Sequence, residues 1–332
     1  MRHPSLALLV VAVTTVAATT AQPQTIAPNK AKAAKPWTVP RTPDGHPDLQ
    51  GSWSNATLTP FERPKELAGK EFFTEQEAAE FTRTTLERAN RDRRGATAQD
   101  DVGGAYNEVW FERGTKVGSN LRTSIVVDPP DGRVPALTPG AREAAAARAS
   151  VQARPPEGPE DFTLPVRCLQ WGNSGPPMVP GPYNNNYRIV QTHDYLVINV
   201  EMIHDARIIL LNGPLNGPLN GRAHIAPGIR QWLGDSVGHW EGDTLVVDTT
   251  NFTGKTHFRG SDENLHVVER FTRTGAETLR YQFAIDDPTA FIRPWAGELV
   301  MSPAPGRLYE YACHEGNYSL AHMLAGARAA EK

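Results

Sequence analysis

The chain has 332 residues, with 34 Lys and Arg against 37 Asp and Glu, and it contains 28 Gly and 28 Pro. This composition excludes a coiled coil, a helical bundle and a polytopic membrane protein, and the net charge of −3 argues against a nucleic-acid-binding protein held by bulk charge. Seven Trp, eight Tyr and eleven Phe supply material for a core, so we expect a loop-rich, mainly β protein.

Residues 1–21 have the pattern of a secretory signal peptide. A short basic start precedes about 13 apolar or small residues (Leu6–Ala18), a stretch that is shorter than a membrane span. Thr19 and Ala21 place small residues at the −3 and −1 positions of a cut after Ala21. We therefore expect a periplasmic or secreted protein with no membrane span after cleavage. The alternative is an uncleaved anchor.

Cys168 and Cys313 are the two cysteines of the chain. Because an oxidising compartment permits a disulfide, we expect these residues to be bonded to each other. The alternative is two free thiols, one of which could act as a nucleophile beside His314.

Composition divides the chain after the signal into three segments. Residues 22–40 are rich in Ala, Lys, Pro and Gln and predict a flexible leader. Residues 41–160 predict a segment that wraps around the core and carries two short helices. Residues 161–332 predict a β-barrel core that ends in a C-terminal helix.

Helix signals occur at three places. Thr74 and Glu77 fit a capping box, which predicts a helix over the following charged stretch. Pro139, directly after Thr138, suits the first turn of a second helix. The sequence SLAHMLAGAR, which begins at Ser319, predicts the C-terminal helix.

Short runs with a period of two predict the strands of the core. Leu196 and Ile198 share one face of such a run, while Glu201 lies on the other. The predicted strands are Thr123–Val127, Tyr187–Gln191, Tyr195–Met202, Ala206–Leu211, Gly238–Trp240, Thr244–Thr250, His266–Thr272, Thr278–Ile285, Glu298–Met301 and Leu308–Cys313. The fold class predicted is mainly β: an antiparallel meander that closes into a lipocalin-like barrel and so removes its edges.

Residues 211–222 read LNGPLNGPLNGR, a tandem repeat of four residues. The repeat is dense in turn-forming residues and lies between predicted strands, so we interpret it as a duplicated hairpin loop. It is too short for a solenoid.

Long blocks of sequence run from about residue 41 to 328. They read RTPDGHPDLQGSW, RTSIVVDPPDGRVPALTP, VEMIHDARII, WLGDSVGHWEGDTLVVDTTNF, FRGSDENLHVVERFT and YEYACHEGNYSL. These blocks resemble a family of exported, largely uncharacterised bacterial proteins of about this length, a resemblance that implies no established catalytic residue. Residues 187–313 also resemble lipocalin-like (calycin) barrels, through a Trp-x-Gly-Asp hairpin followed by Leu-Val-Val.

Common cofactor and catalytic motifs are missing from the sequence. It contains no P-loop, no Gly-x-Gly-x-x-Gly after a strand, no His-Glu-x-x-His and no Gly-x-Ser-x-Gly. Two cysteines cannot form a four-thiolate zinc site. We therefore predict no cofactor and no metal, although a site built from His204, His239 and His314 with an acid is conceivable.

Two polar clusters at predicted strand ends are candidates for proton transfer. His314 and Glu315 precede the C-terminal helix and are our first choice, although they could instead cap that helix and hydrogen-bond around the disulfide. His204 lies at a tight turn, where Glu201 or Asp205 could orient it. If Glu201 faces the barrel interior, burial would raise its pKa.

Other polar and aromatic residues predict a ligand-binding rim. The residues predicted to bind substrate are Arg270, Trp232, His239, Trp240, Asn251 and Tyr311. Arg270 would hold an anionic group or pair with an interior acid. Asp235, Ser236 and His239 also suggest a catalytic triad, but triads are usually assembled from segments distant in sequence.

The predicted function is an exported enzyme that performs cofactor-independent acid–base chemistry, as a lyase, isomerase or hydrolase, on a small apolar or aromatic substrate. The alternative is a non-catalytic periplasmic protein that binds a small molecule. A third class, a surface interaction module, would have no deep pocket. We expect no nucleic-acid partner, and the sequence predicts neither the substrate nor the oligomeric state.

Overall fold

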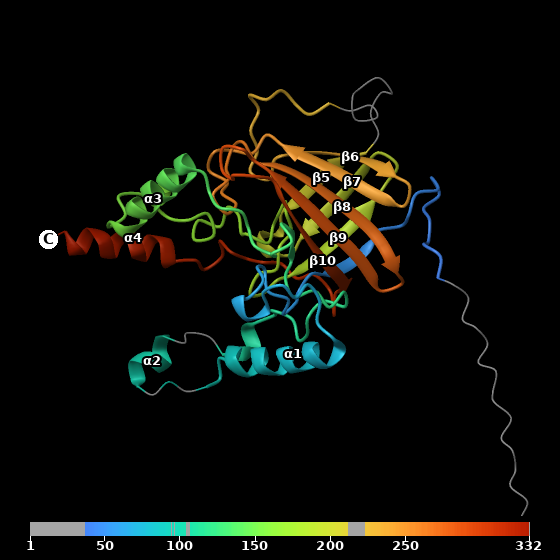
Figure 1. Cartoon of the computed structure of the whole chain (residues 1–332). Coiled ribbons are helices and arrows are strands. Elements are labelled where there is room, and N and C mark those ends of the chain that lie inside the picture. The colour runs from blue at the N-terminus through green and yellow to red at the C-terminus, as the bar shows by residue number, and fades with distance from the viewer. Residues whose placement is uncertain (1–36, 94, 96, 104–106, 212–222, 332) are drawn as a thin grey trace, which may run out of the picture. The chain divides into compact units, whose positions relative to one another are not determined.

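The computed structural model describes residues 37–93, 95, 97–103, 107–211 and 223–331, which are mainly β (Figure 1). The predicted signal peptide, most of the predicted leader and the LNGP repeat after Leu211 lie outside these residues. No helix in the described part of the chain is long and apolar enough to cross a membrane.

Strands wrap into a closed barrel (Figure 1). Its members, in the order in which they pair, are β1 (Gly51–Ser54), β3 (Asn186–Gln191), β4 (Tyr195–Val200), β5 (Ala206–Leu210), β6 (Asp235–Glu241), β7 (Thr244–Thr250), β8 (His266–Gly275), β9 (Thr278–Asp286) and β10 (Trp295–Pro303). The last of them, β10, pairs back with β1. A further strand, β2 (Val126–Asp128), pairs with β10 at Ala296 and Gly297. The predicted fold class, a mainly β chain closing into a barrel, is confirmed.

The strand directions differ from the expected meander at one place. All neighbours in the ring are antiparallel except β5 and β6, which run parallel and pair only at Ile209–Ser236 and Leu210–Val237. Directions cannot alternate around a ring with an odd number of strands, so one parallel pair is required. The connection that contains the LNGP repeat therefore joins parallel strands and is not a hairpin.

The barrel is closed by a strand from the N-terminal segment. Trp53 and Ser54 of β1 pair with β10 on one side, and all four residues of β1 pair with β3 on the other. Residues 308–313, predicted as a strand, have no regular secondary structure. The physical reason is that β1 and β2 already occupy the edge of β10, which leaves no ladder for a later strand to join.

Helices form at the three predicted places, and α2 forms in addition where no helix was predicted. The Thr74 side chain accepts from Glu77 N–H and the Glu77 carboxylate accepts from Thr74 N–H, which completes the capping box. Thr138 accepts from Ala141 N–H in the same way. The helices are α1 (Glu75–Ala89), α2 (Ala98–Gly103), α3 (Pro139–Ala153) and α4 (Ser319–Ala330), with 3-10 turns η1 (Lys65–Leu67), η2 (Glu108–Trp110), η3 (Pro159–Asp161) and η4 (Met202–His204).

The barrel interior is packed with side chains. Large aromatic residues that are almost fully buried fill it, among them Tyr187, Phe271, Tyr281, Phe283 and Trp295. Ring pairs such as Phe271–Tyr281 and Phe283–Trp295 lie 5.0 and 5.9 Å apart, within the range of favourable aromatic contacts. These aromatic side chains therefore fill the barrel by packing against one another.

Candidate functional site

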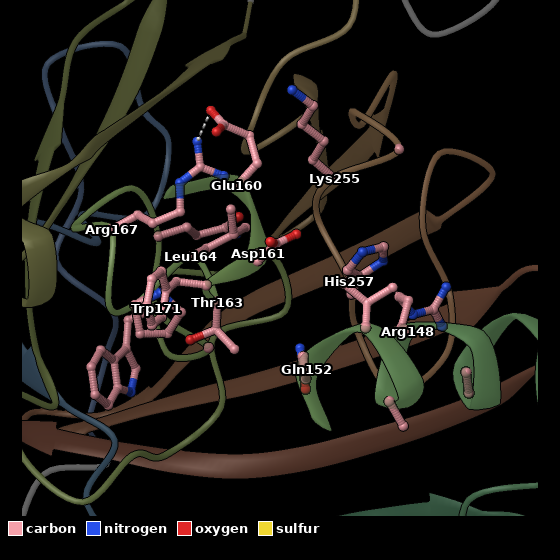
Figure 2. Close-up of a pocket in the computed structure, with 18 residues that line it drawn as sticks. Arg148, Gln152, Glu160, Asp161, Thr163, Leu164, Arg167, Trp171, Lys255 and His257 are labelled. Atoms are coloured by element: carbon pink, nitrogen blue, oxygen red, sulfur yellow. Dashed lines mark ion pairs between the residues drawn. The ribbon is translucent and has the colours of Figure 1, made fainter. Parts of the chain in front are cut away.

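A cavity of about 650 Å³ lies at the C-terminal half of α3, and we call it the α3 pocket (Figure 2). Its walls come from three stretches of chain: α3, residues 160–172 and residues 254–257. The first two stretches are near each other in sequence, whereas residues 254–257 are far from both, so only the fold brings the third wall to the other two.

The first wall is one face of α3. Ala145, Arg148, Ala149 and Gln152 line the cavity and are spaced at i, i+3, i+4 and i+7, which places them on the same side of a helix. The small side chains of the alanines leave room for the cavity between the longer ones. Arg148 is therefore flanked on this face by the small side chains of Ala145 and Ala149.

The second wall is held by covalent and hydrogen bonds. Cys168 lies within it and forms the predicted disulfide with Cys313, with 5.7 Å between the Cα atoms. At the C-terminal end of α4, Arg328 donates to the carbonyl oxygens of Pro156 and Glu157, which precede this wall. The stretch is thus fixed to the C-terminal segment at two points.

The third wall is a tight loop that carries Lys255 and His257. Its conformation is set by neighbours: the Thr256 hydroxyl donates to the Trp232 carbonyl over 2.8 Å, and Lys255 N–H donates to the Thr253 hydroxyl over 3.1 Å. Both side chains of interest lie at the cavity.

The pocket combines charged groups with apolar surface. Arg148 and His257 lie close together, on the opposite side from Trp171 and Leu164 (Figure 2). Arg148 has one carboxylate, that of Asp262, at 3.9 Å. One end of the cavity therefore carries Arg148 and His257, and the other carries Leu164 and Trp171 beside the Glu160–Arg167 ion pair (Figure 2).

The acids of the pocket are already engaged by other cations. Glu160 lies 3.5 Å from the Arg167 guanidinium, and Asp161 lies 3.6 Å from Arg154. The Lys255 ammonium has no ion-pair partner within the described part of the chain. Lys255 is therefore available to receive an anion.

His257 is a candidate for proton transfer. Partial burial of the ring, together with the nearby charge of Arg148, lowers its pKa below the usual value of 6.5. The imidazole is therefore neutral at neutral pH, with one nitrogen free to accept a proton. His257 lines the cavity and is still exposed to solvent.

The residues predicted to be catalytic do not line this pocket. Glu201 is buried, accepting from Asn186 Nδ2 over 2.7 Å and from Tyr309 N–H over 3.2 Å. The Nδ1 of His204 lies 3.1 Å from the Tyr311 carbonyl oxygen. Glu201 and His204 thus tie the stretch 309–311 to the turn after β4.

His314 and Glu315 are exposed, in the stretch between the disulfide and α4. They line neither the α3 pocket nor the second cavity described below. Their catalytic role stays a prediction.

None of the residues predicted to bind substrate lines the α3 pocket. Arg270 is half-exposed and pairs with Glu241, to which His239 Nε2 also bonds over 3.2 Å. Trp240 stacks on His46 with ring centroids 4.9 Å apart. Arg270 therefore faces away from the interior acid Glu269, its neighbour in sequence.

Asn251 and Trp232 belong to the surroundings of the third wall. Asn251 is buried and donates to the Ile225 carbonyl over 3.0 Å. Trp232 lines a second cavity of about 570 Å³ where β5 and β6 diverge, together with Asp235 and Ser236.

Sequence reasoning missed the pocket residues Arg148, Arg167, Trp171, Lys255 and His257. The spacing of Ala145, Arg148, Ala149 and Gln152 within a predicted helix was the signal that could have indicated one wall. The other walls leave no comparable pattern.

No family model, no curated protein and no solved structure matches the chain. The resemblance to a family of exported bacterial proteins therefore stays a prediction. Within the described residues, no group of three or more His, Cys, Asp or Glu side chains is placed to hold a metal ion.

Proposed function

We propose that this protein is an exported small-molecule-binding protein whose α3 pocket takes an organic anion with an apolar or aromatic body. The observation that carries the proposal is that one cavity holds two cations, Arg148 and Lys255, together with an apolar wall. Arg148, Lys255 and His257 lie at the cavity with an apolar wall that includes Leu164 and Trp171. A ligand with a carboxylate at one end of an aromatic ring system matches this arrangement.

The size of the cavity supports a small ligand. Pockets that hold small molecules measure about 300–1,000 Å³ and combine apolar walls with a few polar groups. The α3 pocket, at about 650 Å³, falls within this range. Export is supported by the signal-like residues 1–21 and by the Cys168–Cys313 disulfide, because disulfides persist in oxidising compartments.

A second candidate function is acid–base catalysis on the same ligand class. The neutral imidazole of His257 favours it, since a general base must be unprotonated and within reach of the bound molecule. In this case Arg148 and Lys255 would hold the anionic group while His257 moves a proton. The activity would be that of a lyase, isomerase or hydrolase.

Binding of 1-naphthoate to the protein lacking residues 1–21, measured by calorimetry, tests the proposal. We expect 1-naphthamide, its neutral counterpart, to bind about tenfold more weakly, because charge-assisted hydrogen bonds are stronger than neutral ones. Lys255→Met and Trp171→Ala should each weaken naphthoate binding, whereas the control Lys65→Met, in the exposed turn η1, should not. Equal affinity for acid and amide, or no loss in either pocket variant, would overturn the proposal.

A further inference from the structure

A cluster of titratable side chains joins the segment before β6 to three strands of the barrel. The His224 ring lies between two carboxylates, with Nδ1 2.8 Å from Asp235 on β6 and Nε2 2.9 Å from Asp248 on β7. The other oxygen of Asp248 is 2.8 Å from Nε2 of His266 on β8. The His224 side chain is 20% exposed.

The hydrogen bonds of His224 fix its protonation state. An ionised carboxylate only accepts hydrogen bonds, so an imidazole bonded to carboxylates through both nitrogens must donate from both. The Asp235 carboxylate also accepts from Ile225 N–H over 3.1 Å. His224 in this arrangement is therefore the imidazolium ion.

Charges on every neighbouring strand act on the cluster. Asp235, Asp248 and His266 face His224 from β6, β7 and β8, and Asp286 on β9 acts on His266. The hydrogen bond to Asp248, aided by Asp235 and opposed by burial, raises the pKa of His224 above 6.5. The proton is therefore held to a higher pH than on a free imidazole.

The segment that follows His224 supports a wall of the α3 pocket. The Ile225 carbonyl accepts from the Asn251 side chain over 3.0 Å, and Gln231 N–H donates to the Asn251 carbonyl over 2.9 Å. Thr253 N–H donates to the Gln231 carbonyl over 3.0 Å. The loop with Lys255 and His257 is thus hydrogen-bonded to the segment that follows His224. His224 in turn anchors the start of that segment to β6 and β7.

We propose that protonated His224 is a clamp on the wall of the α3 pocket that carries Lys255 and His257, and that this wall loosens when His224 loses its proton. The consequence for ligand affinity rests on the proposed function. His257 does not account for a change above neutral pH, because its own pKa is lowered and its ring is already neutral there.

Hydrogen exchange of the protein lacking residues 1–21 tests the clamp without any ligand. After correction for intrinsic rates, amides of residues 251–257 should lose protection as pH rises from 6.5 to 9, while β9 keeps its protection. His224→Gln, which cannot carry the charge, should lose protection of the same amides at pH 6.5. The control Arg270→Gln, in an exposed ion pair, should behave as wild type.

Titration of the His224 ring by NMR provides a second measurement that needs no variant. Loss of protection should follow the His224 titration. The clamp would be overturned if the amides of residues 251–257 kept the same protection across this pH range and in His224→Gln. A stoichiometric metal at His224 and His266, found by elemental analysis, would also overturn it, since the metal would then supply the positive charge.

Ligand binding separates the clamp from the proposed function. We expect naphthoate affinity to fall about tenfold on deprotonation of His224 and, by reciprocity, naphthoate to raise the His224 pKa by about one unit. If hydrogen exchange of residues 251–257 depends on His224 but naphthoate does not bind, the clamp is supported and the proposed function is overturned. Naphthoate binding with the same affinity in His224→Gln at pH 6.5 would support the function and overturn the clamp.

Discussion

Arg207 on β5 and Glu269 on β8 form an ion pair inside the barrel, with side chains that are 1% and 0% exposed. Nη1 of Arg207 donates to Oε1 of Glu269 over 3.0 Å, and the Tyr281 hydroxyl donates to the same oxygen over 2.7 Å. The charges compensate each other in surroundings that water does not reach. The pair therefore makes the barrel core sensitive to the loss of either member.

Glu269→Ala should lower the free energy of unfolding by about 3–5 kcal/mol, because it leaves the buried Arg207 charge without a partner. Urea unfolding measures the change. The adjacent Arg270→Gln is the matched control: it breaks a partly exposed pair with Glu241, so we expect a loss of only about 0–1 kcal/mol. A loss below about 1 kcal/mol for Glu269→Ala would contradict the interpretation.

Breaking the disulfide should destabilise the protein strongly. Cys168 and Cys313 are 145 residues apart, and loop-closure entropy assigns about 5 kcal/mol to a loop of that length. The double variant Cys168→Ser, Cys313→Ser should therefore melt at a lower temperature than oxidised wild type. Addition of a reductant should lower the melting temperature of the wild type and leave that of the variant unchanged. Detection of two free thiols in protein that is unfolded without reductant would show that the disulfide is absent.

Gly297 on β10 is required by close packing across the sheet. It pairs with Phe283 on β9, and a Cβ atom at Gly297 would overlap the Phe283 ring. Gly297→Ala should lower the free energy of unfolding by about 1–3 kcal/mol, because an extra methyl group in a packed core forces its neighbours to shift. The control Gly140→Ala, near the start of α3 with open space around it, should be neutral or stabilise by up to about 1 kcal/mol, measured by the same denaturation.

The stability that the His224–Asp248–His266 cluster supplies should depend on pH in a defined direction. The pKa values of His224 and His266 are raised above 6.5 by hydrogen bonds to Asp248, so their contribution is complete below 6.5 and disappears as pH rises through the raised values. Hydrogen bonds from both histidines hold the Asp248 pKa below 3.8, so its contribution fails only in strong acid. Unfolding free energy should fall from pH 6.5 to 9, and Asp248→Asn should flatten that slope.

Two histidine variants separate the candidate sites for acid–base chemistry. Any hydrolysis of a naphthalenedicarboxylate monoester, which keeps one carboxylate, should be lost in His257→Gln, which removes the neutral imidazole at the α3 pocket. His314→Gln alters an exposed side chain outside the pocket and should leave the rate within about twofold. Loss of turnover in His314→Gln alone, with a native circular dichroism spectrum, would favour the assignment made from sequence.

Local patterns were enough to predict most elements. The capping box at Thr74 and the proline at 139 define helix starts, and alternation defines strands such as β4 and β9, because these signals depend on neighbouring residues alone. The disulfide was predictable since two cysteines allow one pairing.

Features that depend on distant pairing were not predictable. The four residues of β1 show no alternation and become a strand only through β3 and β10. The parallel direction of β5 and β6, and the absence of a free edge for residues 308–313, are properties of the closed ring. The α3 pocket was missed for the same reason, because its walls meet only in the folded chain.

The pairing of β1 with β10 has a consequence for the order in which the chain can fold. β1 is made early in synthesis, and its second partner is the last strand of the barrel, so the ring stays open until nearly the whole chain is available. Contacts of such long range slow folding and expose unpaired strands in the meantime. A chain that crosses a membrane unfolded would thus remain without its closed barrel until translocation is almost finished.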